Sequence, residues 1–186
     1  VGKDQEQHLE MTRRFARRFN NMYQVAYFPE PDAYNFGDEL LKVPGLDGSG
    51  KMGKTEGNAI YLSDEPEVIQ KKVMRAVTDA GPSEPNQEMN EPISNIFNLM
   101  KIISTEDTYM HFLDQYNTCK IRYGDMKKQL ARDIIEFTEP LREKIKAIQA
   151  DDAYLKKVVE QGREKAKASA SKTLKAVREI IGIHRF

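Results

Sequence analysis

The sequence predicts a mainly α-helical protein, on two observations. Apolar residues recur at helical spacing over residues 4–20 and again over most of residues 64–181, with a polar, proline-rich loop expected at residues 79–92. Charged residues make up 31% of the 186 residues and hydrophobic residues 39%, a balance that suits a soluble, helix-rich protein. Between the two helical regions, residues 21–63 are rich in glycine and proline, so loops with short extended pieces are expected there.

Each helical segment has its own start signal or apolar face. Asp64 is expected to cap one helix and Ser94 another, since short polar side chains accept hydrogen bonds from the first free backbone N–H groups. Pro140 lies inside a long helical pattern and is expected to kink it. The helices are predicted at residues 4–20, 64–77, 94–103, 106–116, 125–148 and 152–181, with an extended piece at Gln24–Phe28 and a short strand at Ala59–Leu62.

The charge balance, the length of apolar runs and the cysteine content limit which kinds of protein this chain can be. Lys plus Arg equals Asp plus Glu at 29 each, which argues against a strongly basic nucleic-acid-binding chain but allows a local basic face. From Asp151 onward there are nine Lys or Arg against five Asp or Glu, so the last helix could follow phosphates or simply face solvent. No apolar run reaches the roughly 18 residues of a membrane span. Cys119 is the single cysteine, interpreted as a small buried residue, and a cytoplasmic location is expected.

A glycine- and lysine-rich loop is the clearest chemical signal. Gly48–Thr55 satisfies the phosphate-loop pattern G-x-x-x-x-G-K-[ST]. A phosphate loop follows a buried strand and opens a helix, so that the helix N-terminus faces the phosphate. Here Pro44-Gly45 precedes the pattern and Glu56-Gly57-Asn58 follows it, which breaks a helix at once. The context therefore argues against a P-loop nucleotide hydrolase.

The same residues favour another interpretation. Lys51-Met-Gly-Lys-Thr55 resembles the Lys-Met-Ser-Lys-Ser signature of class I aminoacyl-tRNA synthetases. Two lysines three residues apart on a glycine-rich loop can reach one polyphosphate from the same side. A mobile loop lets them close on ATP while charge builds on the departing pyrophosphate. The plain alternative is a solvent-exposed basic turn.

Further segments extend this resemblance along nearly the whole chain, from Val1 to about Ile181. Val1-Gly-Lys-Asp-Gln5 and the helix after it resemble the strand-to-helix segment of tryptophanyl-tRNA synthetases, which starts Val-Gly-Glu-Asp-Gln. Ala76–Asp79 and Pro92–Ile96 are similar to segments that join the two domains of that family. The resemblance implies a C-terminal remnant of a Rossmann-type catalytic domain at residues 1–78, including the lysine loop. An all-helical tRNA anticodon-binding domain is implied at residues 79–186.

The resemblance also assigns roles to residues. Lys51 and Lys54 are implied as the catalytic, phosphate-binding pair, and Gln5 as a residue that holds the amino group of tryptophan. Gly53 replaces a family serine and Lys3 a family glutamate, and neither change removes a charge that the chemistry requires. Mg²⁺ is expected to arrive with ATP, with no protein ligand assigned. The implied ATP-binding residues are Gly2, Lys3, Asp4, Val43, Lys51, Met52, Gly53, Lys54 and Thr55.

The implied activity is ATP-dependent activation of tryptophan and its transfer to tRNA-Trp, by a homodimer without membrane attachment. The family's His-rich signature has no counterpart, because the histidines are His8, His111 and His184. Together with the start at Val1, this predicts a fragment that lacks the N-terminal half of the active site and is inactive alone. A tyrosyl-tRNA synthetase and a non-catalytic helical RNA-binding module remain alternatives. Candidate tRNA contacts are Arg122, Lys127, Lys128, Arg132 and the basic residues of the last helix.

Overall fold

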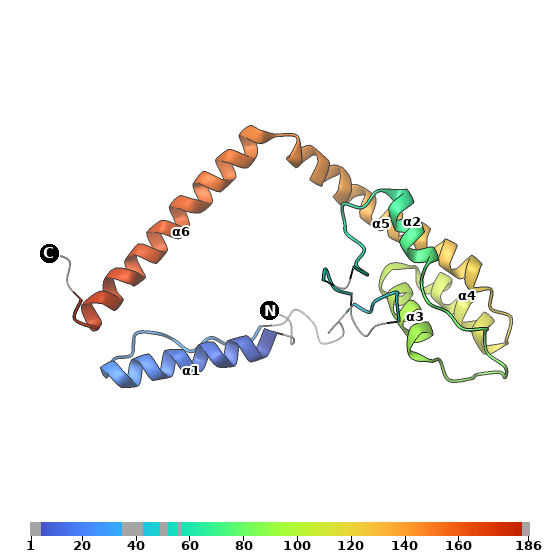
Figure 1. Ribbon diagram of the computed structural model, residues 1–186, viewed down its shortest axis with the longest axis horizontal. Coiled ribbons are helices and arrows are strands. Elements are labelled where there is room, and N and C mark those ends of the chain that lie inside the picture. Colours follow the sequence, from blue (N-terminus) through green and yellow to red (C-terminus); the bar gives the residue numbers. More distant parts are fainter. Residues whose placement is uncertain (1–4, 35–42, 49–51, 56, 184–186) are drawn as a thin grey trace. The chain divides into compact units, whose positions relative to one another are not determined.

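The computed structural model describes residues 5–34, 43–48, 52–55 and 57–183. Every regular element within these residues is a helix, so the prediction of a mainly α-helical protein is confirmed (Figure 1). The chain forms two compact units: unit 1 comprises residues 1–41 and 152–186, and unit 2 comprises residues 42–151. The domain boundary predicted after residue 78 falls inside unit 2 and stays a prediction. None of the described helices has a stretch long and apolar enough to cross a membrane.

Unit 1 contains α1 (Glu6–Tyr23) and α6 (Asp152–Ile180). The chain leaves α1 through Gln24, whose φ of 54° lies in the left-handed region. The side chain of Asn20 then holds the returning backbone, donating to the Phe28 carbonyl at 2.8 Å and accepting from the Phe28 N–H at 3.1 Å. The Gln24–Phe28 segment therefore folds back along its own helix, held by both the backbone carbonyl and the side chain of Asn20.

Unit 2 contains four helices, of which α2 and α3 pack on α5 and α4 packs on α3 (Figure 1). They are α2 (Pro66–Met74), α3 (Glu91–Ile103), α4 (Glu106–Asn117) and α5 (Tyr123–Gln149). Their apolar faces form one core, and among its completely buried side chains are six that represent α2, α3 and α5. These are Ile69, Val73, Ile93, Ile96, Met126 and Leu130.

Two of the predicted helix caps are wrong. α3 is capped by Asn90, whose side chain accepts a hydrogen bond from the Ile93 N–H at 3.1 Å, so the helix begins one turn before Ser94. α2 begins after Glu65, whose side chain makes no cap bond. Asp64 instead accepts hydrogen bonds from the Tyr61 N–H at 2.9 Å and from the Lys72 ammonium at 2.5 Å. In α3 the side chain of Asn90, rather than that of Ser94, accepts from a free N–H group of the first turn. In α2 the Asp64 carboxylate is already bonded to Tyr61 and Lys72 and so does not cap the helix.

The predicted strand at Ala59–Leu62 is also wrong, because side chains occupy the backbone groups that a sheet would need. The Ala59 carbonyl accepts from the ammonium of Lys72 at 2.8 Å. The Ile60 N–H donates to the thioether of Met52 at 3.3 Å. No strand occurs in the described residues, so this segment is a loop fixed by its neighbours.

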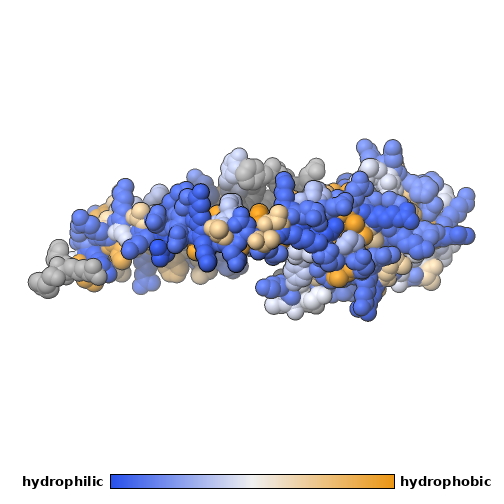
Figure 2. All heavy atoms as spheres, turned by 90° about the horizontal axis from the view of Figure 1, so that it is seen from above, coloured by the Kyte–Doolittle hydropathy of each residue, from blue (hydrophilic) through white to orange (hydrophobic). Residues whose placement is uncertain are grey.

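The long helices bury less than their sequence patterns suggest. α5 continues through Pro140, and in this helix Ile134 is buried, whereas Phe137 is 53% exposed. α6 has no buried residue over its 29 residues. Figure 2 shows hydrophobic side chains among the mainly hydrophilic ones at the surface. Cys119 was expected to be buried but is exposed. It lies after the end of α4, where its φ of 57° is in the left-handed region.

Candidate functional site

The candidate site is the segment Val43–Ile60, here called the lysine loop, which is described except for residues 49–51 and 56. Met52 closes it at two points. Its backbone N–H donates to the Val43 carbonyl at 2.7 Å, and its sulfur accepts from the Ile60 N–H. The start, middle and end of the loop therefore meet at one residue of the lysine signature.

A second closure passes through Asn58. The amide oxygen of Asn58 accepts a hydrogen bond from the Gly53 N–H at 2.8 Å, and its amide nitrogen donates to the Asp47 carboxylate at 2.9 Å. Gly57, directly before it, has a φ of 70°, which glycine adopts without steric cost. This turn lets the side chain of Asn58 face back toward the signature.

The loop is attached to the core of unit 2 through Leu46. The side chain of Leu46 is 6% exposed and belongs to the core cluster. Its carbonyl accepts a hydrogen bond from the Val77 N–H at 2.9 Å, just beyond the end of α2. Because Asp47 is the next residue, the carboxylate that holds Asn58 stands on a fixed piece of backbone.

The far end of the loop is tied to α2 and α5. Lys72 of α2 bonds both the Ala59 carbonyl and the Asp64 carboxylate. Arg142 of α5, only 4% exposed, donates to the Asp64 carbonyl at 3.2 Å. Lys146 forms an ion pair with Glu65 at 3.0 Å, and this carboxylate raises the pKa of Lys146. Side chains of α2 and α5 therefore hold the C-terminal end of the loop and the residues that follow it.

A pocket of about 210 Å³ opens beside the closed loop. It is lined by Leu46, Asp47, Gly57, Asn58, Lys72 and Arg75. Lys54 and Thr55 lie at the exposed tip of the loop. The arrangement offers an ammonium group to solvent from a backbone that is held at its base, which suits a group that must meet a phosphate at a defined position.

The position of the next helix also argues against a P-loop. After Thr55 the next helix begins at Pro66, beyond the turn at Gly57. A P-loop needs the helix N-terminus directly behind the glycine-rich turn, so that its N–H groups face the phosphate. The arrangement found here does not have that form, in agreement with the sequence context.

The other predicted site residues are placed as follows. Gln5 belongs to unit 1, where it is exposed and forms the N-cap position of α1. Val43, Met52 and Gly53 are brought together by the loop closures already described. Gly2, Lys3, Asp4 and Lys51 lie outside the described residues.

Among the candidate tRNA contacts, Lys127 is corrected. Its side chain is only 8% exposed, and its ammonium donates to the Ala76 carbonyl at 2.7 Å and to the Thr78 hydroxyl at 3.2 Å. Burial lowers the pKa of Lys127. This lysine therefore joins α5 to the segment after α2 rather than facing RNA. Arg122, Lys128, Arg132 and the basic side chains of α6 are exposed, except for the partly buried Arg178, and their role stays a prediction.

Sequence reasoning missed Asp47, Asn58 and Lys72. Asn58 was interpreted only as part of a helix-breaking turn. A polar residue directly after a left-handed glycine is a signal for a side chain that bonds back to nearby backbone, and this signal could have identified it. Lys72 is nineteen positions beyond Gly53 on a separate helix. No local pattern marked it.

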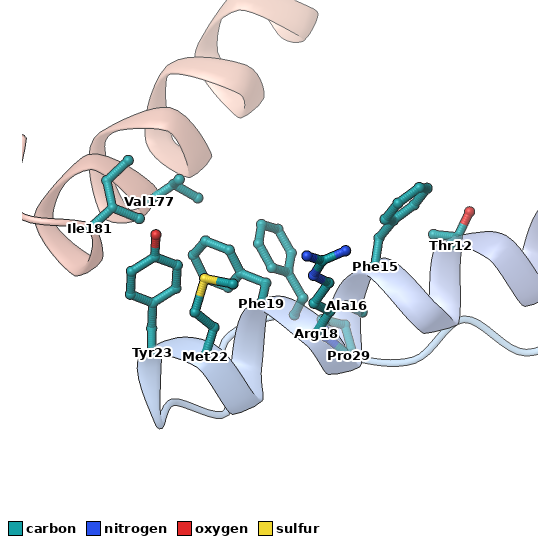
Figure 3. Close-up of a pocket in the computed structure, with 11 residues that line it drawn as sticks. Thr12, Phe15, Ala16, Arg18, Phe19, Met22, Tyr23, Pro29, Val177 and Ile181 are labelled. Atoms are coloured by element: carbon teal, nitrogen blue, oxygen red, sulfur yellow. The ribbon is translucent and has the colours of Figure 1, made fainter.

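Unit 1 contains a larger, apolar groove of about 600 Å³ between α1 and the end of α6. Figure 3 shows Phe19, Met22 and Tyr23 of α1 on one side, facing Val177 of α6 and Ile181, the residue after this helix. Apolar side chains dominate its lining, so its chemistry is that of packing. Among the described residues, no group of three or more His, Cys, Asp or Glu could hold a metal ion.

Comparison with known proteins defines the class of this chain. Residues 1–139 match the family described as tRNA synthetases class I (W and Y). The chain belongs to this family.

Several proteins similar to this chain are tryptophan enzymes. The chain is 60% identical over 182 residues to the tryptophan–tRNA ligase of Porphyromonas gingivalis, covering 98% of this chain and 56% of that protein. It is 34% identical to the tryptophan–tRNA ligase of Treponema pallidum, covering 98% and 54%. A crystal structure of tryptophanyl-tRNA synthetase from Campylobacter jejuni with ADP and tryptophan matches with a TM-score of 0.75 at 28% identity, covering 98% and 56%. The chain thus spans about half the length of the relatives that it matches.

Proposed function

We propose that this chain is the C-terminal part of an enzyme that ligates tryptophan to tRNA-Trp at the expense of ATP. The observation that carries the proposal is 60% identity to a tryptophan–tRNA ligase along 98% of the chain. The held lysine loop supports it, because this loop presents the ammonium of Lys54 at an exposed tip.

The reaction has two steps. A carboxylate oxygen of tryptophan attacks the α-phosphorus of ATP, the bond to the β-phosphate oxygen breaks, and pyrophosphate leaves. The terminal ribose hydroxyl of tRNA then attacks the carbonyl of the adenylate, and AMP leaves. Neither step uses a protein nucleophile, so the protein acts by positioning and by stabilising the charge that develops on the phosphates.

In this proposal Lys51 and Lys54 neutralise the charge of the departing pyrophosphate. The backbone of Met52 and Gly53 keeps the two lysines at their spacing. Gln5 holds the amino group of tryptophan. The remaining ATP contacts are made by Gly2, Lys3, Asp4, Val43 and Thr55.

The larger organisation follows the family. Residues 1–78 form the C-terminal part of a Rossmann-type catalytic domain, and residues 79–186 form the helical anticodon-binding domain. Mg²⁺ enters as the ATP complex, with phosphate oxygens as its ligands. The whole enzyme acts as a cytoplasmic homodimer.

Tryptophan-dependent exchange between pyrophosphate and ATP tests the proposal, measured with the longer protein that carries this chain. Tryptophan is expected to support exchange and tyrosine is not. Lys54→Ala should slow the exchange by about 10²–10³-fold, the range seen when one transition-state charge donor is removed. Lys144→Ala, an exposed lysine of α5, is the matched control and should leave the rate unchanged.

The opposite results have clear meanings. Exchange with tyrosine alone would assign the tyrosyl enzyme. Absence of exchange with either amino acid, with tRNA binding retained, would assign the non-catalytic RNA-binding module.

A further inference from the structure

The lysine loop contains a link that joins its signature to the core of unit 2. The link runs from the Asp47 carboxylate to the Asn58 amide nitrogen at 2.9 Å, and from the Asn58 amide oxygen to the Gly53 N–H at 2.8 Å. Asn58 is half-buried, and Asp47 follows the buried Leu46. A single side chain therefore connects the middle of the signature to a fixed part of the fold.

The group of the lysine signature that bonds Asn58 is a backbone N–H, so the bond fixes the orientation of a peptide. The Gly53 N–H belongs to the peptide between Met52 and Gly53, and the next residue is Lys54. Fixing the orientation of that peptide restricts the direction in which the chain carries Lys54. Because Gly53 has no β-carbon, its own backbone preferences are weak, and the orientation depends on external bonds of this kind.

The two ends of the Asn58 amide have different tasks, and only one orientation of the amide satisfies both. The oxygen must face an N–H donor, and the nitrogen must face a carboxylate acceptor. Asp47 therefore selects the orientation of the amide, and the amide selects the orientation of the Gly53 peptide. Charge on Asp47 strengthens the bond between them, since hydrogen bonds with an ionised partner are shorter and stronger.

We propose that Asn58 is a positioning residue for the ATP reaction: with Asp47, it sets the Gly53 peptide so that Lys54 meets the phosphates as pyrophosphate departs. This proposal rests on the proposed function. Asn58 acts through the loop backbone rather than on the substrate. Its contribution therefore appears in the rate of the first chemical step more than in the binding of tryptophan.

The experiment uses the longer protein that carries this chain and measures tryptophan-dependent pyrophosphate exchange. Asn58→Ala removes both bonds and is expected to lower kcat by about 10- to 100-fold, since a small misplacement of a charged group is enough to slow chemistry to this extent. The KM for tryptophan should change less than twofold. Asn98→Ala is the matched control, because the Asn98 side chain only reaches Ser94 within α3 at 3.4 Å.

A pair of exchanged residues tests the link itself. Asn58→Asp keeps an oxygen for the Gly53 N–H but places a carboxylate against that of Asp47, so it should slow exchange at least as much as Asn58→Ala. Combining Asn58→Asp with Asp47→Asn restores a donor facing an acceptor, in reverse order. The double variant is expected to recover to within about threefold of the wild-type rate. Thermal unfolding of all variants separates loss of positioning from loss of folding, because only the former is accompanied by an unchanged melting temperature.

Three results would overturn the inference. The first is wild-type exchange by both single variants at position 58. The second is a double variant as slow as Asn58→Asp alone. The third is a rise in the KM for tryptophan that accounts for the whole loss. In each of these cases wild-type exchange still supports the proposed function, whereas a wild-type protein that does not exchange with tryptophan removes both.

Discussion

Units 1 and 2 both have apolar residues at helical spacing, but these residues are buried in unit 2 and mostly exposed in unit 1. Among the described residues, every buried hydrophobic side chain except Ala16 belongs to unit 2. In unit 1, α6 buries nothing, and α1 leaves Phe15 65% exposed and Met22 60% exposed. Unit 2 has a core because α2 and α3 both pack on α5, and α4 packs on α3, so each apolar stripe meets another. A row of apolar residues at helical spacing thus predicts a helix and its apolar face. Whether that face is buried in a core depends on another element packing against it.

The largest expected effect contrasts the two units directly. Leu130→Ala in the core of unit 2 should lower the free energy of unfolding by about 2–5 kcal/mol, since it removes completely buried methyl groups and leaves a cavity. Leu174→Ala in α6, where the side chain is 49% exposed, should change it by no more than about 0.5 kcal/mol. Urea unfolding of this chain measures both. Equal losses in the two variants would contradict the contrast between the units.

Leu130→Ala and Leu174→Ala, made in the longer protein, test the contrast between the two units further. The relatives are about twice as long as this chain, which covers 56% of the one from Porphyromonas gingivalis. If further chain covers α6 there, Leu174→Ala should cost more in the longer protein than in the 186-residue chain. An unchanged small cost would mean that the apolar stripe of α6 stays in contact with water.

A smaller effect is expected from the buried ammonium of Lys127. Lys127→Met removes its bonds to the Ala76 carbonyl and the Thr78 hydroxyl and should cost about 1–3 kcal/mol near neutral pH. The pKa of Lys127 is lowered in the folded chain by burial from its ordinary value of 10.5, so the unfolded chain binds more protons between the two values. Stability contributed by this group therefore rises as pH increases through that window. Urea unfolding from pH 7 to 10.5 should show wild type gaining stability relative to the variant.

The stability contributed by Tyr123 changes with pH in the opposite direction to that contributed by Lys127. Its hydroxyl donates to the Asp79 carboxylate at 2.8 Å, and Tyr123→Phe should cost about 1 kcal/mol. Burial, and then the bond to Asp79, raise the pKa of Tyr123 above its ordinary value of 10.0. The folded chain keeps a proton that the unfolded chain loses, so this stabilisation is complete below pH 10 and declines above it. An advantage of wild type over the variant that grows above pH 10 would contradict this assignment.

The smallest effect belongs to an ion pair at the surface of unit 1. Arg17 bonds Glu30 through two nitrogens, at 2.7 and 2.6 Å, and this bond lowers the pKa of Glu30 below its ordinary value of 4.5. The contribution of the pair is present above pH 4.5 and is lost as pH falls through the lowered value. Glu30→Gln should therefore lower the melting temperature slightly at pH 7 and not at pH 2. A large decrease at pH 7 would show that unit 1 depends on this contact.

The local signals in the sequence were sufficient for most helices and for the lysine loop as a candidate site. Residues 106–116 were predicted as a helix from their apolar face and form α4 (Glu106–Asn117), where Phe112 and Tyr116 of that face are buried. Errors arose where another side chain bonded a backbone group that the prediction had assigned to a strand or to a different cap. Lys72 and Met52 occupied the backbone of the predicted strand, and Asn90 replaced Ser94 as the cap of α3.

The sequence alone determined the helical periodicity, the glycine–lysine loop and the family resemblance, because each depends on residues that are close in the chain. Tertiary structure decided which apolar faces are covered, that Lys127 is buried, and that Asn58 joins Asp47 to Gly53. These depend on distances between segments that the order of residues does not fix. A hydrogen bond or a buried contact needs its partner within a few ångströms. The packing of α2 and α3 on α5 brings the core partners together, and the turns of the lysine loop bring together Asp47, Asn58 and Gly53.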